Sequence, residues 1–267
     1  MTLSVVIPAL NEAANLSELL PLLRGQSRPP DEILVAEAGS TDDTAAVAER
    51  CGARLVPGGR PAHGRNHGAR EASGEWVFFL DADTRPPDGE FIARVLEELD
   101  RRRLAAAVCD CRAYYRPGDR GHDRPWLRAW DRLLMAGQNG GVRAWHGRGF
   151  PVGLAVFMAV RREEFLSLGG FRGEVEPYED SEYLLRAHRA LTPAPGQGSA
   201  VGVLAPSTQV LISMRRYDVK GRVVFPLWMG FRGSFLRWAL GRELPQPDYW
   251  DLNRRGFGSA KGPDDAG

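Results

Sequence analysis

The stretch Glu75-Trp76-Val77-Phe78-Phe79-Leu80-Asp81-Ala82-Asp83 combines an apolar run with two carboxylates at its end. The uncharged residues 76–80 include aromatic and β-branched side chains that favour extended structure. A short apolar run of this kind is typical of a central strand covered on both faces. Side chains two apart on a strand point the same way, so Asp81 and Asp83 are expected together at its carboxyl end. In open α/β sheets, ligands bind at that end.

Asp81 and Asp83 would repel each other and lose hydration there unless a cation joins them. A hard divalent ion that also binds a diphosphate fits such a pair. The alternative is a solvent-exposed acidic loop that caps a helix expected near residues 87–91. An isolated Asp-x-Asp is more often a solvent-exposed loop than a metal site. The metal hypothesis therefore depends on what else reaches this edge of the sheet.

Composition places the chain among ordinary globular proteins. It has 267 residues, of which 43% are hydrophobic and 26% charged, enough for one large α/β domain or two small ones with an ample core. The formal net charge of +1 gives no global field that would attract nucleic acid. Cys51, Cys109 and Cys111 show no metal-site spacing and suit a reducing compartment. Residues 1–5 lead directly into a strand-like run without a basic leader, which predicts a cytoplasmic protein.

Strand-like and helix-like patterns alternate along the first 80 residues. The expected strands are 3–7, 32–36, 54–56 and 76–80. Of the helices expected between them, the first is capped by Asn11 or Asn15, the second is capped by Ser40 or Thr41, and the third begins at Arg65. This alternation predicts an α/β fold with a mostly parallel sheet and right-handed crossovers. Gly-x-Gly-x-x-Gly does not follow the first strand, and there is no Gly-Lys-Ser/Thr loop, which argues against dehydrogenases and P-loop enzymes.

Five motifs in order carry a resemblance to a known family. They are Val5-Val6-Ile7-Pro8-Ala9-Leu10-Asn11-Glu12, Gly39-Ser40-Thr41-Asp42-Asp43-Thr44, Arg65-Asn66-x-Gly68, Asp81-Ala82-Asp83, and Gly169-Gly170-Phe171 followed by Glu179-Asp180 and Arg186. Each motif alone is a weak signal. In this order and spacing, over roughly residues 3–190, the chain resembles a family 2 glycosyltransferase of the GT-A fold.

The resemblance implies a nucleotide-sugar site. The expected nucleotide contacts are Pro8, Ala9, Leu10, Asn11, Glu12, Glu37, Gly39, Arg65, Asp81 and Ala82. Asp83 would bind a divalent metal ion, Mg²⁺ or Mn²⁺, and Asp81 would contact ribose or metal-bound water. Glu37 stands where the family usually has Asp, and Ala38 replaces a common second Asp. These differences leave the identity of the donor nucleotide open: UDP is favoured, and GDP is the alternative. No redox cofactor is implied.

The resemblance also implies an acceptor side with a general base. Asp180 matches the family's catalytic carboxylate, which takes the acceptor proton in an inverting displacement. The alternative reading is helix N-terminal charge, and both readings can hold together. Further expected contacts of the acceptor or the diphosphate are Glu179, Glu182, Gly153, His146, Arg215 and Arg216. Residues 138–149 are expected to form a mobile segment around His146.

The expected organisation is a nucleotide-sugar-binding half, 1–105, and an acceptor-binding half, 106–215, of one GT-A domain. An apolar and aromatic extension, 216–255, and a disordered tail, 256–267, follow. Residues 223–240 are too interrupted to span a membrane but suit a membrane surface, a dimer contact or a lid. The processive Gln-x-x-Arg-Trp signature is missing, which predicts a single transfer per encounter.

These observations predict a hexosyltransferase-like enzyme that moves a sugar from a nucleoside-diphosphate sugar to a hydroxyl. The acceptor is left open among a lipid carrier, a metabolite and a glycan. The expected location is the cytoplasm, with peripheral contact at the inner face of the membrane. A nucleotidyltransferase and a catalytically inactive sugar-nucleotide-binding module are the alternatives.

Overall fold

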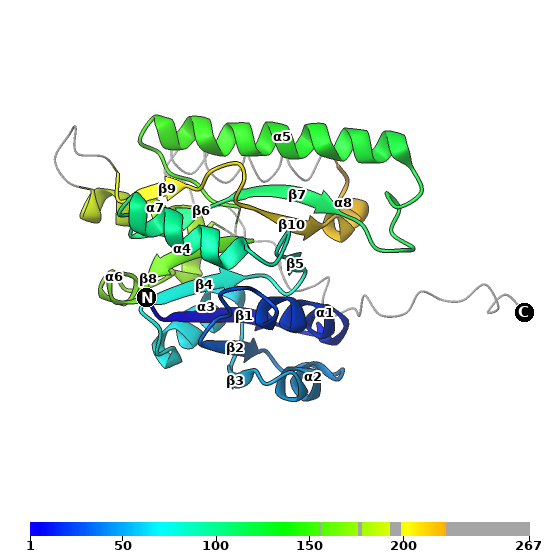
Figure 1. Cartoon of the computed structure of the whole chain (residues 1–267), viewed down its shortest axis with the longest axis horizontal. Helices are drawn as coiled ribbons and strands as arrows, with labels where there is room; N and C mark the ends of the chain where they lie inside the picture. Colours follow the sequence, from blue (N-terminus) through cyan, green and yellow to red (C-terminus); the bar gives the residue numbers. More distant parts are fainter. Residues whose placement is uncertain (155, 176–177, 193–198, 223–267) are drawn as a thin grey trace, which may run out of the picture.

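The fold is built on a seven-stranded sheet in the order β3-β2-β1-β4-β8-β6-β9 (Figure 1). It is seen in a computed structural model, which describes residues 1–154, 156–175, 178–192 and 199–222. The strands of this sheet are β1 (Leu3–Ala9), β2 (Glu32–Glu37), β3 (Arg54–Pro57), β4 (Trp76–Leu80), β6 (Ala106–Val108), β8 (Phe157–Arg161) and β9 (Val201–Val203). β4, the strand expected at the centre, is buried along its whole length.

Neighbouring strands from β3 to β4 run parallel, as the alternating sequence pattern predicted. β8 then pairs antiparallel with both β4 and β6, and β9 runs parallel to β6. In the apolar run 153–160, β8 begins only at Phe157. The predicted mostly parallel α/β sheet is therefore confirmed, with one reversed strand in its second half.

A second sheet of three strands, β5 (Thr84–Arg85), β10 (Gln209–Ser213) and β7 (Asp110–Tyr114), lies beside the first. β10 pairs antiparallel with β5 and parallel with β7. The sequence pattern did not predict β5, because it is only two residues long, or β7, because it mixes charged and apolar residues. This small sheet holds residue 213 against the Asp83 segment, with the Ser213 amide 3.4 Å from the Asp83 carbonyl oxygen.

Helices cover both faces of the large sheet, and the described helices are α1 (Ala13–Arg24), α2 (Thr44–Arg50), α3 (Pro61–Glu71), α4 (Phe91–Arg101), α5 (Pro125–Gly147), α6 (Arg162–Ser167), α7 (Glu179–Leu191) and α8 (Arg215–Lys220). Alternate residues of β4 enter two different cores, as the two-residue period of a strand requires. Phe78 packs in the core that includes the leucines of α1, whereas Phe79 contacts Phe165 and Phe171 on the other face.

Two predicted helix caps were wrong. The residue that caps α1 is Glu12, not Asn11 or Asn15, and neither α1 nor α2 has a side-chain capping hydrogen bond. α2 is preceded by Asp43 rather than by Ser40 or Thr41 as its cap. These polar side chains instead join neighbouring loops, because the loops at adjacent strand ends lie against each other.

The predicted mobile segment 138–149 was also wrong for most of its length, because α5 continues to Gly147. Each helical glycine costs about 1 kcal/mol relative to alanine, so Gly140 and Gly141 argued locally against a helix. Tertiary contacts override this preference. The Asn139 side chain bonds both the amide and the carbonyl of Cys111, at 3.0 and 2.9 Å, and Val142 is buried.

The predicted C-terminal extension and tail lie outside the described residues, except for 216–222, most of which belong to α8. Within the described part of the chain, no helix is both long and apolar enough to cross a membrane.

Candidate active site

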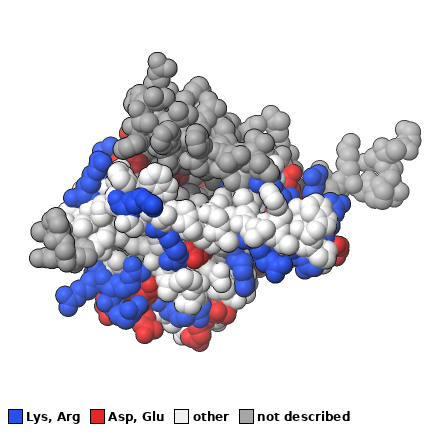
Figure 2. Space-filling view, turned by 90° about the horizontal axis from the view of Figure 1, so that it is seen from above, with Lys and Arg blue, Asp and Glu red and all other residues white. Residues whose placement is uncertain are grey.

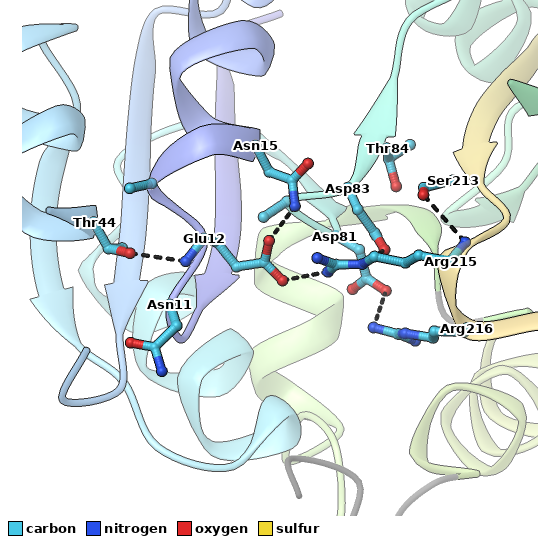
Figure 3. Close-up of polar contacts among 12 residues, drawn as sticks. Asn11, Glu12, Asn15, Thr44, Asp81, Asp83, Thr84, Ser213, Arg215 and Arg216 are labelled. Carbon is cyan, nitrogen blue, oxygen red and sulfur yellow. Dashed lines mark hydrogen bonds and ion pairs between the residues drawn. The ribbon is translucent and has the colours of Figure 1, made fainter. Parts of the chain in front are cut away.

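Polar residues from several elements meet at the carboxyl ends of β1 and β4 (Figure 3). Asn11 and Glu12 follow β1, and Asp81 and Asp83 follow β4. Side chains from the start of α8 approach these carboxylates from the second sheet. Parallel strands bring their carboxyl ends to one edge, so residues far apart in sequence share one site.

Arg65 of α3 joins Asp81 to the first turn of α7. Its Nη2 donates to Asp81 Oδ1 at 2.7 Å and its Nη1 donates to Glu179 Oε1 at 2.8 Å. The Arg65 side chain is only 3% exposed, so this ion pair network is desolvated. The expected nucleotide contact Arg65 therefore fixes two acids in this structure, and it holds the residue before Asp180 against the strand end.

The second oxygen of Asp81 has a cation near it but no hydrogen-bond donor. Asp81 Oδ2 is buried and accepts no hydrogen bond from any described residue. Arg216 Nη2 lies 3.7 Å away, which is an ion-pair distance but too long for a hydrogen bond. A buried carboxylate oxygen without a donor is costly unless a charged group completes its surroundings.

Arg215 bridges the other two acids of the site. Its Nε lies 3.0 Å from Asp83 Oδ2, and its Nη2 donates to Glu12 Oε1. Burial alone would raise the pKa of Asp83, but the charges of Arg215 and Arg216 outweigh it and lower the pKa. For Glu12, burial outweighs Arg215 and raises the pKa. Asp83 is therefore held as a buried anion by cations from α8.

Hydrogen bonds join the loop after β1 to the loop after β2. Asn11, in a left-handed conformation with φ of 55°, accepts a hydrogen bond from the Thr41 amide at 2.8 Å. The Asn11 amide donates to Ser40 Oγ at 2.9 Å, and the Glu12 amide to Thr44 Oγ1 at 2.8 Å. These three hydrogen bonds thus fix the predicted nucleotide loop against residues 40–44.

Glu37 caps its own loop. Its carboxylate accepts the amides of Gly39 and Ser40, at 3.0 and 2.5 Å. Burial would raise the pKa of Glu37, but these hydrogen bonds outweigh it and lower the pKa. A carboxylate has about four acceptor positions, so Glu37 retains capacity for a donor on a nucleotide base. Pro8 and Ala9 are the last residues of β1, and Leu10 is buried after them.

Asp180 lies in a narrow space beside Gly153. A side-chain carbon added at Gly153 would come within 2.6 Å of Asp180 Oδ2, so the glycine backbone lies directly against this carboxylate. The Gly153 amide donates to Ser181 Oγ at 3.1 Å, which anchors the segment to α7. Gly153 and Asp180, both predicted from the sequence, are thus brought together.

Glu182 and His146 are engaged elsewhere. Glu182 accepts hydrogen bonds from Arg186, at 2.8 and 3.0 Å, and pairs with Arg172 at 3.2 Å. His146 Nε2 lies 2.8 Å from the Val152 carbonyl oxygen, and burial lowers the pKa of this imidazole. In this structure these two predicted contacts stabilise α7 and the turn after α5.

The site contains Asn15, which the sequence suggested only as a helix cap. The Asn15 amide bonds Glu12, and its carbonyl oxygen accepts from Arg116 Nη2 at 2.6 Å. Asn15 thereby orients the acid that Arg215 contacts. A polar residue on the buried face of a predicted helix was the available signal, since such residues need hydrogen-bond partners.

Asp81 and Asp83 fit a divalent ion that takes its other ligands from a bound molecule. No group of three or more metal-binding side chains occurs among the described residues. Mg²⁺ and Mn²⁺ are oxygen-preferring ions, and Mg²⁺ is commonly held by one or two carboxylates together with substrate phosphates and water. The donor-free Asp81 Oδ2 and the anionic Asp83 meet that description.

Comparison with known proteins agrees with this architecture. The family described as "Glycosyl transferase family 2" matches residues 4–163, more than half of the chain. An uncharacterized glycosyltransferase of Haemophilus influenzae is 25% identical over 198 residues, which cover 69% of this chain and 61% of the relative. The chain thus spans less than two thirds of that protein's length.

Two solved structures share the fold. The mannosyltransferase PcManGT from Pyrobaculum calidifontis, solved with GDP-Man and Mn²⁺, has a TM-score of 0.58 and 24% identity, over 78% of this chain and 56% of that one. Glucosyl-3-phosphoglycerate synthase from Mycobacterium tuberculosis, solved with Mn²⁺, UDP and phosphoglyceric acid, has a TM-score of 0.51 and 23% identity, over 86% and 78%. These likenesses confirm the predicted GT-A fold. With the matched family and the shared fold, the chain belongs to glycosyl transferase family 2.

Proposed function

We propose that the protein transfers a sugar from a nucleoside-diphosphate sugar to a hydroxyl acceptor with the help of a divalent metal. The observation that carries this proposal is the ion-pair chain Asp81–Arg65–Glu179, which ties the expected metal site to the turn that carries Asp180. Donor and acceptor chemistry can then take place at one sheet edge. Arg215 and Arg216 supply positive charge at the same edge.

Asp83, with Asp81 beside it, would hold Mg²⁺ or Mn²⁺. Bound there, the ion would supply Lewis-acid stabilisation of the diphosphate. Arg215 and Arg216 are placed to donate charge-assisted hydrogen bonds to phosphate oxygens, which are acceptor-rich and suit guanidinium groups. In the structure, Arg215 pairs with Asp83 and Arg216 with Asp81, which places both guanidinium groups at the expected metal and diphosphate site.

For the donor we favour UDP, with GDP as the alternative. The loop formed by Pro8 to Glu12 lies against residues 39–44, where a base and ribose would be enclosed. Glu37 offers the acceptor for a base N–H. PcManGT was solved with GDP-Man and the mycobacterial synthase with UDP, so the fold accommodates either nucleotide.

Asp180 is our candidate general base. Its carboxylate would take the proton of the acceptor hydroxyl while that oxygen bonds to the anomeric carbon. The bond between this carbon and the diphosphate oxygen breaks at the same time, and Arg215 and Arg216 would stabilise the negative charge left on the diphosphate. Attack on the face opposite the leaving group gives inversion. The acceptor is a hydroxyl on a lipid carrier, a metabolite or a glycan.

Release of nucleoside diphosphate from a panel of UDP- and GDP-sugars tests this proposal. Wild-type protein with metal should release it, and Asp180→Asn should lower turnover by 100-fold or more, given general-base contributions of about 10²–10⁴. Asp100→Asn, an exposed acid on α4, is the matched control and should leave turnover unchanged. Release of pyrophosphate would indicate a nucleotidyltransferase instead. Nucleotide binding without any turnover would indicate an inactive binding module.

A further inference from the structure

The two acids of the candidate metal site lie on one tight turn. The Thr84 amide donates to the Asp81 carbonyl oxygen at 3.0 Å, which closes the turn around Ala82 and Asp83. The Ser213 amide of the second sheet lies 3.4 Å from the Asp83 carbonyl oxygen. A side chain leaves the backbone in a direction that the backbone sets. Whatever fixes this turn therefore also fixes where the two carboxylates point.

Arg85, the residue after this turn, bonds its two other carbonyl groups. Arg85 Nη1 donates to the Ala82 carbonyl oxygen at 3.0 Å and to the Thr84 carbonyl oxygen at 2.7 Å. These are the carbonyl groups on either side of Asp83, and Arg85 itself is only 4% exposed. Every carbonyl group from residue 81 to residue 84 thus has a hydrogen-bond donor within the domain.

The Arg85 guanidinium is itself held on two sides. Its Nη2 donates to Glu18 Oε2 of α1 at 3.1 Å, and its Cζ lies 5.6 Å from the centre of the Tyr114 ring at the end of β7. A guanidinium over an aromatic face is attracted by the ring electrons. The Tyr114 hydroxyl has no hydrogen-bond partner within the described ranges of the chain. The ring is therefore the part of Tyr114 that supports Arg85.

Arg85 belongs to a ring of polar contacts around this turn. Glu18, which accepts from Arg85, also pairs with Arg116 at 3.0 Å, and Arg116 donates to Asn15 Oδ1 at 2.6 Å. From Asn15, two further side chains complete the ring at the turn (Figure 3). In order, the members of the ring are Arg85, Glu18, Arg116, Asn15, Glu12, Arg215 and Asp83.

The burial of Arg85 distinguishes it from surface charges. Basic and acidic side chains lie side by side at several places on the face of the molecule that Figure 2 shows. Exposed pairs of this kind contribute little to stability, because water and salt screen them. The Arg85 guanidinium instead lies inside the domain and bonds backbone carbonyl groups next to a candidate metal ligand.

We propose that Arg85 is a positioning residue for the divalent metal ion, because it holds the turn that presents Asp81 and Asp83. The inference rests on the proposed function, since it takes these two acids as the metal-binding groups. Groups that orient metal ligands through hydrogen bonds contribute strongly to metal affinity. Arg215 and Arg216 pair with the carboxylates themselves, whereas Arg85 bonds the backbone of the turn. Arg85 can therefore keep its contacts while metal and nucleotide bind.

Calorimetric titration of Mn²⁺ into the protein, with saturating UDP or GDP, tests the proposal. Arg85→Lys keeps the charge, but an ammonium group lacks the planar fork of a stacked guanidinium. This change should weaken Mn²⁺ binding roughly 10- to 100-fold, the usual effect of losing a group that orients a metal ligand. Tyr114→Leu, which removes the aromatic face without a change of charge, should also weaken Mn²⁺ binding. Tyr114→Phe keeps the ring and should bind Mn²⁺ like the wild type.

The matched control is Arg102→Lys. Arg102 Nη1 also bonds a carboxylate and a carbonyl group, Glu98 Oε1 at 2.6 Å and the Val203 carbonyl oxygen at 2.8 Å, but it does so at the β9 edge of the sheet. This variant should leave the Mn²⁺ affinity unchanged. An equal loss of Mn²⁺ affinity in Arg102→Lys and Arg85→Lys would overturn the proposal.

Thermal unfolding without ligands separates a role in the site from a role in the fold. If Arg85 only stabilised the fold, Arg85→Lys would unfold at a lower temperature but bind Mn²⁺ like the wild type, and this result would overturn the proposal. If Arg85→Lys does not fold, the two Tyr114 variants decide, and equal Mn²⁺ affinities in them would overturn the proposal. Absence of metal-dependent nucleotide binding in the wild type would refute the proposed function itself, and this inference with it.

Discussion

Arg65 Nη1 and Glu179 Oε1 lie 2.8 Å apart, although 114 residues separate them in the sequence. The same guanidinium reaches Asp81 Oδ1 at 2.7 Å. One buried cation thus fixes the distance between the end of β4 and the start of α7. Asp83 lies two residues after Asp81, and Asp180 follows Glu179. Loss of the Arg65 ion pairs should therefore lower both the stability of the fold and the turnover.

Arg65→Ala should destabilise the fold strongly. It leaves Asp81 and Glu179 buried without their cation, and breaking a buried ion pair costs about 3–5 kcal/mol. Urea unfolding should show a free energy of unfolding that is lower by that amount. Arg54→Ala is the control, since the Arg54 pairs with Glu32 and Glu71 are far more exposed, and it should cost at most about 1 kcal/mol. Equal losses in the two variants would show that the Arg65 bridge contributes no more than a surface pair.

Arg215→Ala should change metal and nucleotide binding in opposite directions. Without nucleotide, Mn²⁺ should bind more tightly, because Arg215 no longer neutralises Asp83 and Glu12. The nucleoside diphosphate should bind roughly 10- to 100-fold more weakly, since a hydrogen bond to a charged group contributes about 1.5–3 kcal/mol. Calorimetric titrations measure both affinities.

Arg112→Ala, an exposed arginine on β7, is the control for this pair of titrations and should change neither affinity. If Arg215→Ala weakened the binding of both Mn²⁺ and nucleotide, Arg215 would only stabilise the structure of the site. It would then not be a group that pairs with the diphosphate in place of Asp83.

Gly153→Ala should impair turnover while nucleotide binding persists. The new methyl group would lie 2.6 Å from Asp180 Oδ2, so the carboxylate must move from its present position. A displacement of this size should lower kcat at least tenfold, as a misplacement of about 1 Å can cost 100-fold. Gly137→Ala, where nothing lies within 4 Å of the added carbon, should leave kcat unchanged. A normal kcat for Gly153→Ala would remove Asp180 from the reaction.

Acidification should destabilise the protein in part through His146. Burial lowers the pKa of this imidazole below the ordinary value of 6.5, so the unfolded chain binds the proton more tightly. Its contribution to stability is complete above that ordinary value and is lost as the pH falls below it. The loss between about pH 7 and about pH 5 should be smaller in His146→Gln, whose amide can still donate to the Val152 carbonyl. Thermal unfolding across this range, with His122→Gln as control, measures the difference. The same pH dependence in all three proteins would contradict this assignment.

The strands that end at the candidate site could be predicted from the sequence, because their local pattern agrees with their place in the fold. Residues 76–80 are apolar on both faces and end at charged Asp81, so their pattern alone predicted a buried central strand. The second half of α5 was expected to be a mobile segment instead, because its glycines disfavour a helix locally while Asn139 and Val142 are held by contacts with the rest of the domain.

The partners within the site were less predictable. The contact of Glu12 with Arg215 joins residues 203 apart, and it forms because β10 pairs with the two-residue strand β5 beside Asp83. Short strands of mixed composition carry too little periodicity to be recognised in advance. The roles of Asp83, Asp180 and Arg215 remain predictions that the variants above address.

The most direct measurement is the thermal stability of wild type and Asp83→Asn with UDP or GDP, each with and without Mn²⁺. A ligand that binds only the folded state raises its stability by mass action. The proposed site predicts a shift with one nucleotide that requires Mn²⁺ and is absent in Asp83→Asn. An equal shift without metal, or the full shift in Asp83→Asn, would contradict a metal-dependent nucleotide-sugar site at the end of β4.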